Sequence, residues 1–257
     1  MKALSIAASG MVAQQHRTEV VANNLANMNT SGYQRRRMEF NNLIYSHAIR
    51  RPKAGSRAGE LVPSGVHTGI GVKPASVYRI QEQGALKQTS NTFDLAIQGE
   101  GYFQIQLPNG DLAYTRDGTF QLNDAGQMVT HDGFPVQPSI SVPPNATDIT
   151  INNSGDVLAT QDGGVTANVG TLLLAVFPNA GGLKAVGNNL FVATEQSGAA
   201  ASTSPGLGGT GTVLQGFVES SNVNPVEEIS AMIRASRAYE MNSKVMKAAD
   251  EMMATRR

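Results

Sequence analysis

Few residues of this chain have the type and spacing that catalysis or metal binding requires. The four histidines, His16, His47, His67 and His131, are spread over 257 residues, and no two have the spacing of a zinc motif such as H-E-x-x-H. The chain contains no cysteine, so thiol catalysis, disulfide bonds and cysteine zinc sites are excluded. It also lacks G-x-S-x-G, the motif that carries the serine nucleophile of many hydrolases.

Two pairs of carboxylates are close enough in the sequence to be considered as acid and base catalysts. They are Asp94 with Glu100, and Asp117 with Asp124. Each pair lies beside a glycine turn or within a strand pattern, which favours a role in turns or on the surface. The glycine-rich run at residues 208–212 lacks the lysine of a phosphate-binding loop. We therefore predict a non-enzymatic protein with no catalytic residues, no metal site and no cofactor.

The overall charge gives no reason to expect nucleic acid or an anionic membrane as a partner. Twenty lysine and arginine residues balance twenty aspartate and glutamate residues. No apolar run approaches the roughly 18–20 residues that a membrane-spanning helix needs, so no membrane insertion is expected. The first residues look like a signal peptide, but Ser5, Ser9 and Gly10 interrupt the apolar run and no clear cleavage site follows. Any export would need a route without a cleaved signal.

An amphipathic helix is predicted at residues 3–28. One column of its residues alternates spacings of four and three, which is helical periodicity. The column is Leu4, Ala8, Met11, Gln15, Thr18, Ala22 and Leu25. Serine, glycine and asparagine lower the helix propensity, so this helix would be marginal alone. The other face of this helix is polar with few charges, which suits packing against other helices or a neutral channel wall. The alternative is an ordinary terminal helix that packs on its own domain.

A second helix is predicted near the C-terminus. Asn224 suits the cap, Pro225 suits the first helical position, and Glu227 opposes the positive end of the helix dipole. Downstream residues repeat every 3.5 positions, as in a coiled-coil seam. This seam is Met232, Ala235, Tyr239, Asn242, Met246, Ala249 and Met253. Only the N-terminal helix has the length to cover it within the chain. Asn242 could fix the register of the pair, although a solvated Asn242 is equally compatible with the pattern.

Residues 31–72 are predicted to form an extended arm or a long hairpin. Many prolines and glycines exclude a helix there. The arm carries a basic cluster of Arg50, Arg51, Lys53 and Arg57. Such a cluster is either a solvated surface or a contact for an acidic groove on a neighbouring subunit. Nucleic acid is a weaker interpretation, because the arm lacks regularly interleaved aromatic residues.

Residues 73–221 are predicted to form a β-rich domain, because short apolar runs alternate with turn residues. Asn109-Gly110 and the segment 123–126 each indicate a hairpin. Later strands are expected at residues 149–152, 157–160, 170–177 and 190–193. Residues 196–212, which are rich in glycine, serine, alanine and threonine, are expected to form a flexible loop.

These elements together predict an α+β fold. Paired N- and C-terminal helices, coiled-coil-like and formed by residues 1–30 and 222–257, would make one domain. The extended arm would connect it to the β-rich central domain. A chain whose two ends meet as a helical pair, with a β body looped out between them, is suited to polymerisation.

Four segments of the chain resemble the bacterial flagellar rod and hook proteins. Residues 4–10 are similar to the family's opening helix, and residues 22–33 to its asparagine-rich signature. Residues 91–116 contain Gly99-Glu100-Gly101-Tyr102-Phe103, and residues 219–242 end in Arg237-Ala238-Tyr239-Glu240-Met241-Asn242. One such motif would be weak, but four in the family's order over nearly the whole chain are specific.

The resemblance implies a mechanical role rather than a chemical one. In this family the terminal helices pair and pack with those of neighbouring copies into a hollow tube, and the β domains form its outer shell. The implied partners are further copies of the chain, proximal rod proteins, the hook protein, the surrounding P-ring and L-ring proteins, and the flagellar type III export apparatus. The implied location is the basal body, in the rod that spans the periplasm, after export without a cleaved signal peptide. The expected subunit-packing residues are Leu4, Ala8, Met11, Ala22, Asn23, Asn24, Leu25, Asn27, Tyr33, Val226, Ile229, Met232, Ile233, Tyr239, Asn242, Met246 and Met253.

The basic, Pro/Gly-rich segment at about residues 46–72 favours the distal part of the rod within this family. A hook protein would be longer, and a proximal rod protein of this length would lack so long a segment. We hypothesise that the segment lies between neighbouring subunits and stiffens the rod, so that it transmits torque. The alternative from a different class is a monomeric β-rich module that binds a surface ligand such as a glycan.

Overall fold

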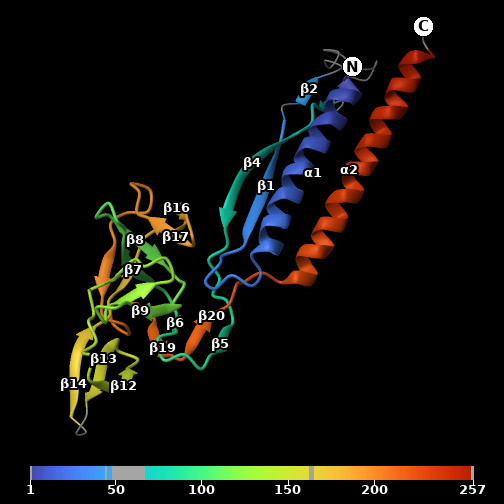
Figure 1. Ribbon diagram of the computed structural model, residues 1–257. Helices are drawn as coiled ribbons and strands as arrows, with labels where there is room; N and C mark the ends of the chain where they lie inside the picture. Colours follow the sequence, from blue (N-terminus) through green and yellow to red (C-terminus); the bar gives the residue numbers. More distant parts are fainter. Residues whose placement is uncertain (1, 44, 48–66, 162–164, 256–257) are drawn as a thin grey trace, which may run out of the picture. The chain divides into compact units, whose positions relative to one another are not determined.

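The computed structural model describes residues 2–43, 45–47, 67–161 and 165–255. The chain divides into two compact units, whose elements are drawn in Figure 1. The helical unit consists of Met1–Leu25, Arg36–Tyr78 and Asn224–Arg257. The β-rich unit consists of Ala26–Arg35 and Arg79–Val223. The predicted α+β fold is confirmed. The residues expected to form the connecting arm are shared between the units, with 31–35 in the β-rich unit and 36–72 in the helical unit.

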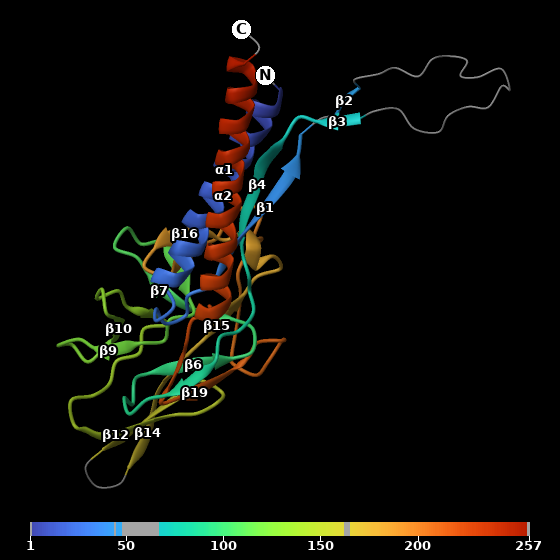
Figure 2. The same ribbon diagram turned by 90° about the vertical axis from the view of Figure 1, so that its right-hand side faces the viewer.

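Two long helices form the helical unit, α1 (Lys2–Ala26) and α2 (Pro225–Ala254). They lie side by side and antiparallel, so that the start of α1 and the end of α2 are at the same end of the pair (Figures 1 and 2). Two contacts agree on this register. Gly10 lies against Asn242, and Asn24 donates a hydrogen bond to Glu228. The predicted pairing of the terminal helices is therefore confirmed.

The start of α2 follows from its local sequence. The side-chain oxygen of Asn224 accepts hydrogen bonds from the backbone N–H groups of Val226 and Glu227. Pro225 occupies the first helical turn, where a missing N–H costs nothing. Glu227 and Glu228 place negative charge beside the positive end of the helix dipole.

A β ribbon completes the helical unit. β1 (Arg36–Asn42) pairs with β4 (Val72–Arg79), and β2 (Tyr45–His47) pairs antiparallel with β3 (His67–Gly69). The ribbon is joined to α1 at Ser9, whose Oγ accepts a hydrogen bond of 3.3 Å from the backbone N–H of Val72. The two ends of the predicted arm therefore lie in strands that pair with each other. Its basic residues Arg50, Arg51, Lys53 and Arg57 lie outside the described residues.

The largest sheet belongs to the β-rich unit and has seven strands. β8 (Leu112–Thr115), β7 (Tyr102–Gln106) and β15 (Leu174–Val176) lie at its centre. Beyond them lie β17 (Leu190–Val192) and β16 (Lys184–Gly187) on one side and β18 (Ala201–Thr203) on the other, and β11 (Val136–Gln137) also pairs with β7. The Asn109-Gly110 turn joins β7 to β8, with Gly110 at φ +88°. This predicted hairpin is confirmed.

Smaller sheets make up the rest of the β-rich unit. They are β9 (Phe120–Leu122) with β10 (Met128–Thr130), β6 (Leu95–Gln98) with β19 (Thr212–Gln215), β5 (Leu86–Gln88) with β20 (Phe217–Glu219), and the three-stranded sheet of β12 (Ala146–Ile151), β13 (Asp156–Gln161) and β14 (Thr166–Thr171). The second predicted hairpin, β9 to β10, is also confirmed, because Gly126 at φ +74° closes its turn.

Apolar side chains from these sheets form the main core of the β-rich unit. Phe103 and Phe120 are at most 1 % exposed, and their rings meet edge to face with centroids 5.2 Å apart. Leu95, Ile97 and Ile105 are fully buried beside them. The apolar positions of the predicted strands thus supply the core, and the burial of each large side chain contributes about 1.5–3 kcal/mol.

Two predictions about the β-rich unit are wrong. Residues 170–177 are not one strand, because β14 ends at Thr171 and β15 begins at Leu174 in a different sheet. Residues 196–212 are not a featureless loop. They contain β18 and a turn in which the Thr210 hydroxyl donates hydrogen bonds to the carbonyls of Ser204 and Leu207. These hydrogen bonds order the turn by satisfying its backbone carbonyls. The composition of the segment does not predict such specific contacts.

Candidate functional site: the outer surface of the helical unit

Small side chains form most of the seam between α1 and α2. The buried apolar residues of α1 are Ala7, Ala13 and Val21, and those of α2 are Ala235 and Ala249. Small residues let the two helices approach closely, but they remove little apolar area from water. The seam alone therefore stabilises the helical pair weakly.

Polar contacts on the seam define how the helices are aligned. A Cβ atom on Gly10 would lie 2.8 Å from the side-chain nitrogen of Asn242, so this position needs glycine if Asn242 is to stay in place. At the other end, the Asn24 side chain donates hydrogen bonds to Glu228 at 3.2 Å and to the carbonyl of Arg36 at 2.8 Å. It also accepts one from the Arg36 backbone N–H. Asn24 thus holds α1, α2 and the first residue of β1 together.

Many large apolar side chains of the helical unit are exposed in the single chain. Their exposed fractions range from 37 % for Met253 to 73 % for Val226. The set comprises Ile6, Val12, Ile70, Val77, Tyr78, Val226, Ile229, Ile233, Tyr239, Met241, Val245, Met252 and Met253. The β-rich unit, although larger, contributes fewer described residues of this kind, namely Met28, Leu112, Val165, Val186 and Leu207. A concentration of exposed apolar residues on one unit marks an interaction surface.

The residues expected to pack between subunits occupy three kinds of position. Exposed ones are Ala22, Asn23, Val226, Ile229, Ile233, Tyr239 and Met253. Half-buried ones are Leu4, Ala8, Met11, Leu25, Asn27, Met232, Asn242 and Met246. Asn24 and Tyr33 are buried within the chain. On α1 the buried line runs through Ala7, Val21 and Asn24, one residue before the column identified in the sequence.

Three exposed residues of α2 were missed as candidates for packing between subunits. Met241, Val245 and Met252 are each more than half exposed. The 3.5-residue repeat identifies only the residues on the face of α2 that meets α1. Val245 and Met252 belong, with Ala231 and Ala238, to a second column beside the seam, which is visible in the sequence but was not expected to pack between subunits.

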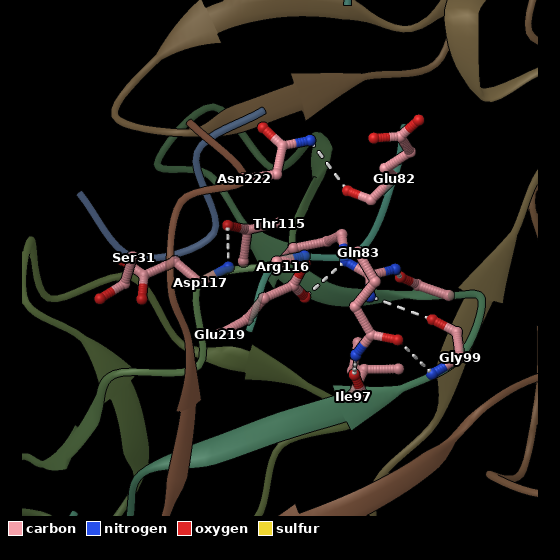
Figure 3. A network of polar contacts seen from close by, with 12 residues as sticks. Ser31, Glu82, Gln83, Ile97, Gly99, Thr115, Arg116, Asp117, Glu219 and Asn222 are labelled. Carbon is pink, nitrogen blue, oxygen red and sulfur yellow. Dashed lines mark hydrogen bonds and ion pairs between the residues drawn. The ribbon is translucent and has the colours of Figure 1, made fainter. Parts of the chain in front are cut away.

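A buried ion pair is the central polar contact of the β-rich unit (Figure 3). Arg116 Nε lies 2.8 Å from a carboxylate oxygen of Glu219, and both side chains are less than 10 % exposed. Arg116 also donates hydrogen bonds to the carbonyls of Gly101 and Gly99, and the other Glu219 oxygen accepts one from the Gly84 N–H. Every charged group of the pair is thus hydrogen-bonded, as burial requires.

Neighbouring amides extend this network around the places where the chain enters and leaves the β-rich unit. The Asn222 side chain accepts a hydrogen bond from the Arg35 N–H and donates to the carbonyls of Ile80 and Glu82 (Figure 3). Gln83 donates to the carbonyl of Ile97. We call the group of Arg116, Glu219, Asn222 and Gln83 the polar clasp. It joins three segments that are far apart in the sequence.

One ionisable group near the clasp has a shifted pKa. Burial raises the pKa of Asp117 above its ordinary value of 3.8, and hydrogen bonds from Thr119 oppose this shift only in part. His131 lies near enough to lower the pKa as well.

Among the described residues, no group of three or more histidines and carboxylates is arranged to hold a metal ion. Nor does any helix there combine the length and hydropathy of a membrane span.

Comparison with protein families identifies the class of protein. Residues 4–34 match the flagella basal body rod protein family, and residues 214–255 match the C-terminal region of the flagellar basal body rod FlgEFG proteins. Residues 96–159 match the D1 domain of the flagellar hook proteins FlgE/F/G. The three matches fall on α1, on α2 and on the β-rich unit, which are the elements of a flagellar rod or hook subunit.

Individual relatives narrow this class further. The chain is 54 % identical to the flagellar basal-body rod protein FlgG of Caulobacter vibrioides, over 98 % of this chain and 97 % of the relative. It is 46 % identical to FlgG of Agrobacterium fabrum, with the same coverage, but only 30 % identical to a FlgF rod protein of Mesorhizobium japonicum. The chain therefore belongs to the FlgG family of flagellar basal-body rod proteins. It is a distal rod subunit, a non-enzymatic structural component of bacterial motility.

Proposed function

We propose that copies of this chain polymerise through their terminal helices into a rigid, hollow shaft. The shaft would transmit torque to the hook, and exported subunits would pass through its channel. In this arrangement the helical units form the inner tube and the β-rich units form the outer shell.

The observation that carries the proposal is the apolar surface of the helical unit. Ile229, Ile233 and Met241 are each at least 47 % exposed in the single chain. Burial of one such side chain is worth about 1.5–3 kcal/mol, so neighbouring copies that cover several of them would gain substantial free energy. A contact between different surfaces of identical subunits does not close on itself and generates a filament.

The further partners belong to the same proposal. A subunit of the distal rod would contact proximal rod proteins at one end, the hook protein at the other, and the P-ring and L-ring proteins around it. It would lie in the part of the rod that spans the periplasm, after type III export without a cleaved signal peptide. The basic residues Arg50, Arg51, Lys53 and Arg57 are proposed to contact neighbouring subunits. Membership of the FlgG family supports these assignments.

Electron microscopy of basal bodies tests the proposal. Cells that lack the gene should produce basal bodies without a distal rod and hook, and the wild-type gene should restore both. A gene encoding Ile229→Asp with Ile233→Asp should fail to restore them, whereas Ser236→Asp, an exposed polar position on the same helix, should succeed. Straight rods with hooks in the deletion strain would overturn the proposal and favour a binding module.

A further inference from the structure

The last segment of the β-rich unit before α2 supplies partners to strands that lie far upstream. β19 pairs with β6, β20 pairs with β5, and among the described strands each pair forms a sheet of its own (Figure 1). β5 and β6 therefore depend on this segment for their ladder hydrogen bonds. We call residues 212–222, which contain β19, β20 and Asn222, the closing segment.

Docking of β19 completes the main core. Leu95, Ala96 and Ile97 of β6 are fully buried. Val213, which lies opposite Ile97 in the β6–β19 pair, is also fully buried and belongs to the main core cluster. Without the closing segment, β6 would expose an unpaired backbone edge and the cluster would lose Val213. The main core is thus incomplete until the closing segment is in place.

Gln215 ties the closing segment to further parts of the unit. Its side-chain oxygen accepts a hydrogen bond of 3.0 Å from the backbone N–H of Ile151 in β12. Its side-chain nitrogen donates to the carbonyls of Ile149, at 2.9 Å, and Thr92, at 3.0 Å. One amide thus satisfies three backbone groups from two separate segments.

The polar clasp depends on the closing segment in the same way. Arg116 and Glu219 are both less than 10 % exposed, and 2.8 Å separates Arg116 Nε from the Glu219 carboxylate. The carbonyls of Gly99 and Gly101, which also accept hydrogen bonds from Arg116, carry no net charge. A buried guanidinium without its carboxylate is strongly unfavourable, so the surroundings of Arg116 cannot close before Glu219 arrives.

The seven-stranded sheet does not have this dependence. All its strands lie between Tyr102 and Thr203, upstream of the closing segment. The β7–β8 hairpin at its centre is closed by a short local turn, whereas β6 and β19 join residues more than a hundred positions apart. Since the entropy cost of closing a loop rises with its length, the long-range pairs form later.

We infer that the closing segment is a strap that docks last when the β-rich unit folds and is released first when the unit opens. The seven-stranded sheet persists while the closing segment, β5 and β6 open together. The use of this order rests on the proposed function. A chain exported through a narrow channel has to be threaded before its body closes, and the closing segment is the last part of the β-rich unit to be synthesised.

Native-state amide hydrogen exchange of the full-length monomer at low urea concentrations tests the inference. Amides of the closing segment, β5 and β6 should exchange together, at least ~10-fold faster than those of β7 and β8. Two variants at fully buried positions sharpen the test. They are Val213→Ala in the closing segment and Ile105→Val in β7.

The two variants should act asymmetrically. Val213→Ala should speed exchange roughly tenfold both in the closing segment and in β7 and β8, because Val213 leaves the core in the partial opening and in full unfolding alike. Ile105→Val should speed exchange several-fold in β7 and β8 and leave the closing segment unchanged, because β7 stays folded in the partial opening. If Val213→Ala does not fold, Glu219→Gln, which keeps the shape of the side chain, takes its place.

The inference is overturned if the closing segment exchanges no faster than β7, or if Ile105→Val speeds exchange in both by the same factor. Either result would mean that the unit opens only as a whole. Because exchange is measured on the monomer, this failure is distinct from failure of the proposed function, which the basal bodies of the deletion strain test.

Discussion

Gly32 occupies a position that other residues cannot adopt without strain. Its φ is +66°, and a Cβ atom there would lie 2.7 Å from the backbone nitrogen of Asp117. Its own N–H donates a hydrogen bond to the carbonyl of Glu219. This glycine of the asparagine-rich signature therefore lets the segment after α1 pack within the β-rich unit.

Gly32→Ala should lower the free energy of unfolding of the β-rich unit. A left-handed conformation at a non-glycine residue costs about 1–3 kcal/mol, and the close approach to Asp117 adds to that cost. Gly110→Ala is the matched control, because Gly110 has φ +88° but no neighbour within 4 Å. Urea denaturation measures both variants. Equal losses would mean that the backbone contact at Gly32 contributes nothing.

Asp117 should make the stability of the β-rich unit depend on pH. Burial raises its folded pKa above the unfolded value, so its favourable contribution is fully present below the unfolded pKa and is lost as pH rises through the folded pKa. Asp117→Asn keeps an acceptor for the Thr119 hydrogen bonds but removes the charge. The variant should be as stable as or more stable than the wild type at neutral pH.

Thermal unfolding at several pH values checks this prediction. The advantage of Asp117→Asn should shrink as the pH falls through the acid range, because the wild-type carboxyl then becomes neutral too. An advantage of the wild type that grows as the pH rises through the acid range would show that the ionised carboxylate stabilises the fold, contrary to the burial argument.

At the scale of elements, the polar clasp joins strands that share no local sequence signal. Arg116 follows β8 and Glu219 ends β20, and their pairing holds the two together. Arg116→Ala should destabilise the β-rich unit by about 3–5 kcal/mol, because it leaves Glu219 charged and buried without its partner. Chemical denaturation of the full chain provides the measurement.

The matched comparison for the clasp is Arg116→Met combined with Glu219→Leu. Removal of both charges should cost less than Arg116→Ala, since no uncompensated charge remains. A double variant that loses as much as the sum of its single variants would show that the two side chains stabilise the unit independently.

The terminal helices should be the least stable elements of the free monomer. Their seam buries mainly alanine, and long helices with little buried apolar area are marginal in water. Amide hydrogen exchange of the monomer should be fast over residues 3–28 and 226–255 and slow in the main core strands. After assembly, exchange should be slow in both. Strong protection of the helices in the monomer would contradict the idea that assembly completes their packing.

At the scale of the whole molecule, assembly into a shaft requires stiffness as well as contact. Deletion of residues 46–64, which lie almost entirely outside the described residues, tests the hypothesis that the basic segment stiffens the rod. The deleted protein should still form rods, because α1 and α2 are intact, but these rods should be bent or flexible under the electron microscope. Straight, rigid rods would refute the stiffening hypothesis while leaving polymerisation intact.

Local signals in the sequence determined the parts of this fold that depend on adjacent residues. The start of α2 at Asn224-Pro225 and the Asn109-Gly110 hairpin were predictable, because a helix cap and a positive-φ turn are decided within a few residues. Four family motifs in order also identified the flagellar rod and hook class. Alternating apolar residues predicted a β-rich body, but not which strands pair.

Only the tertiary structure decided the features that join distant residues. It buried Ala7, Ala13 and Val21 of α1, and left the larger side chains of the predicted column, Leu4 and Met11, only half-buried. It paired Arg116 with Glu219 across more than a hundred residues and assigned Ala26–Arg35 to the β-rich unit. Such choices depend on which surfaces bury each other best, and periodicity along one segment does not contain that information.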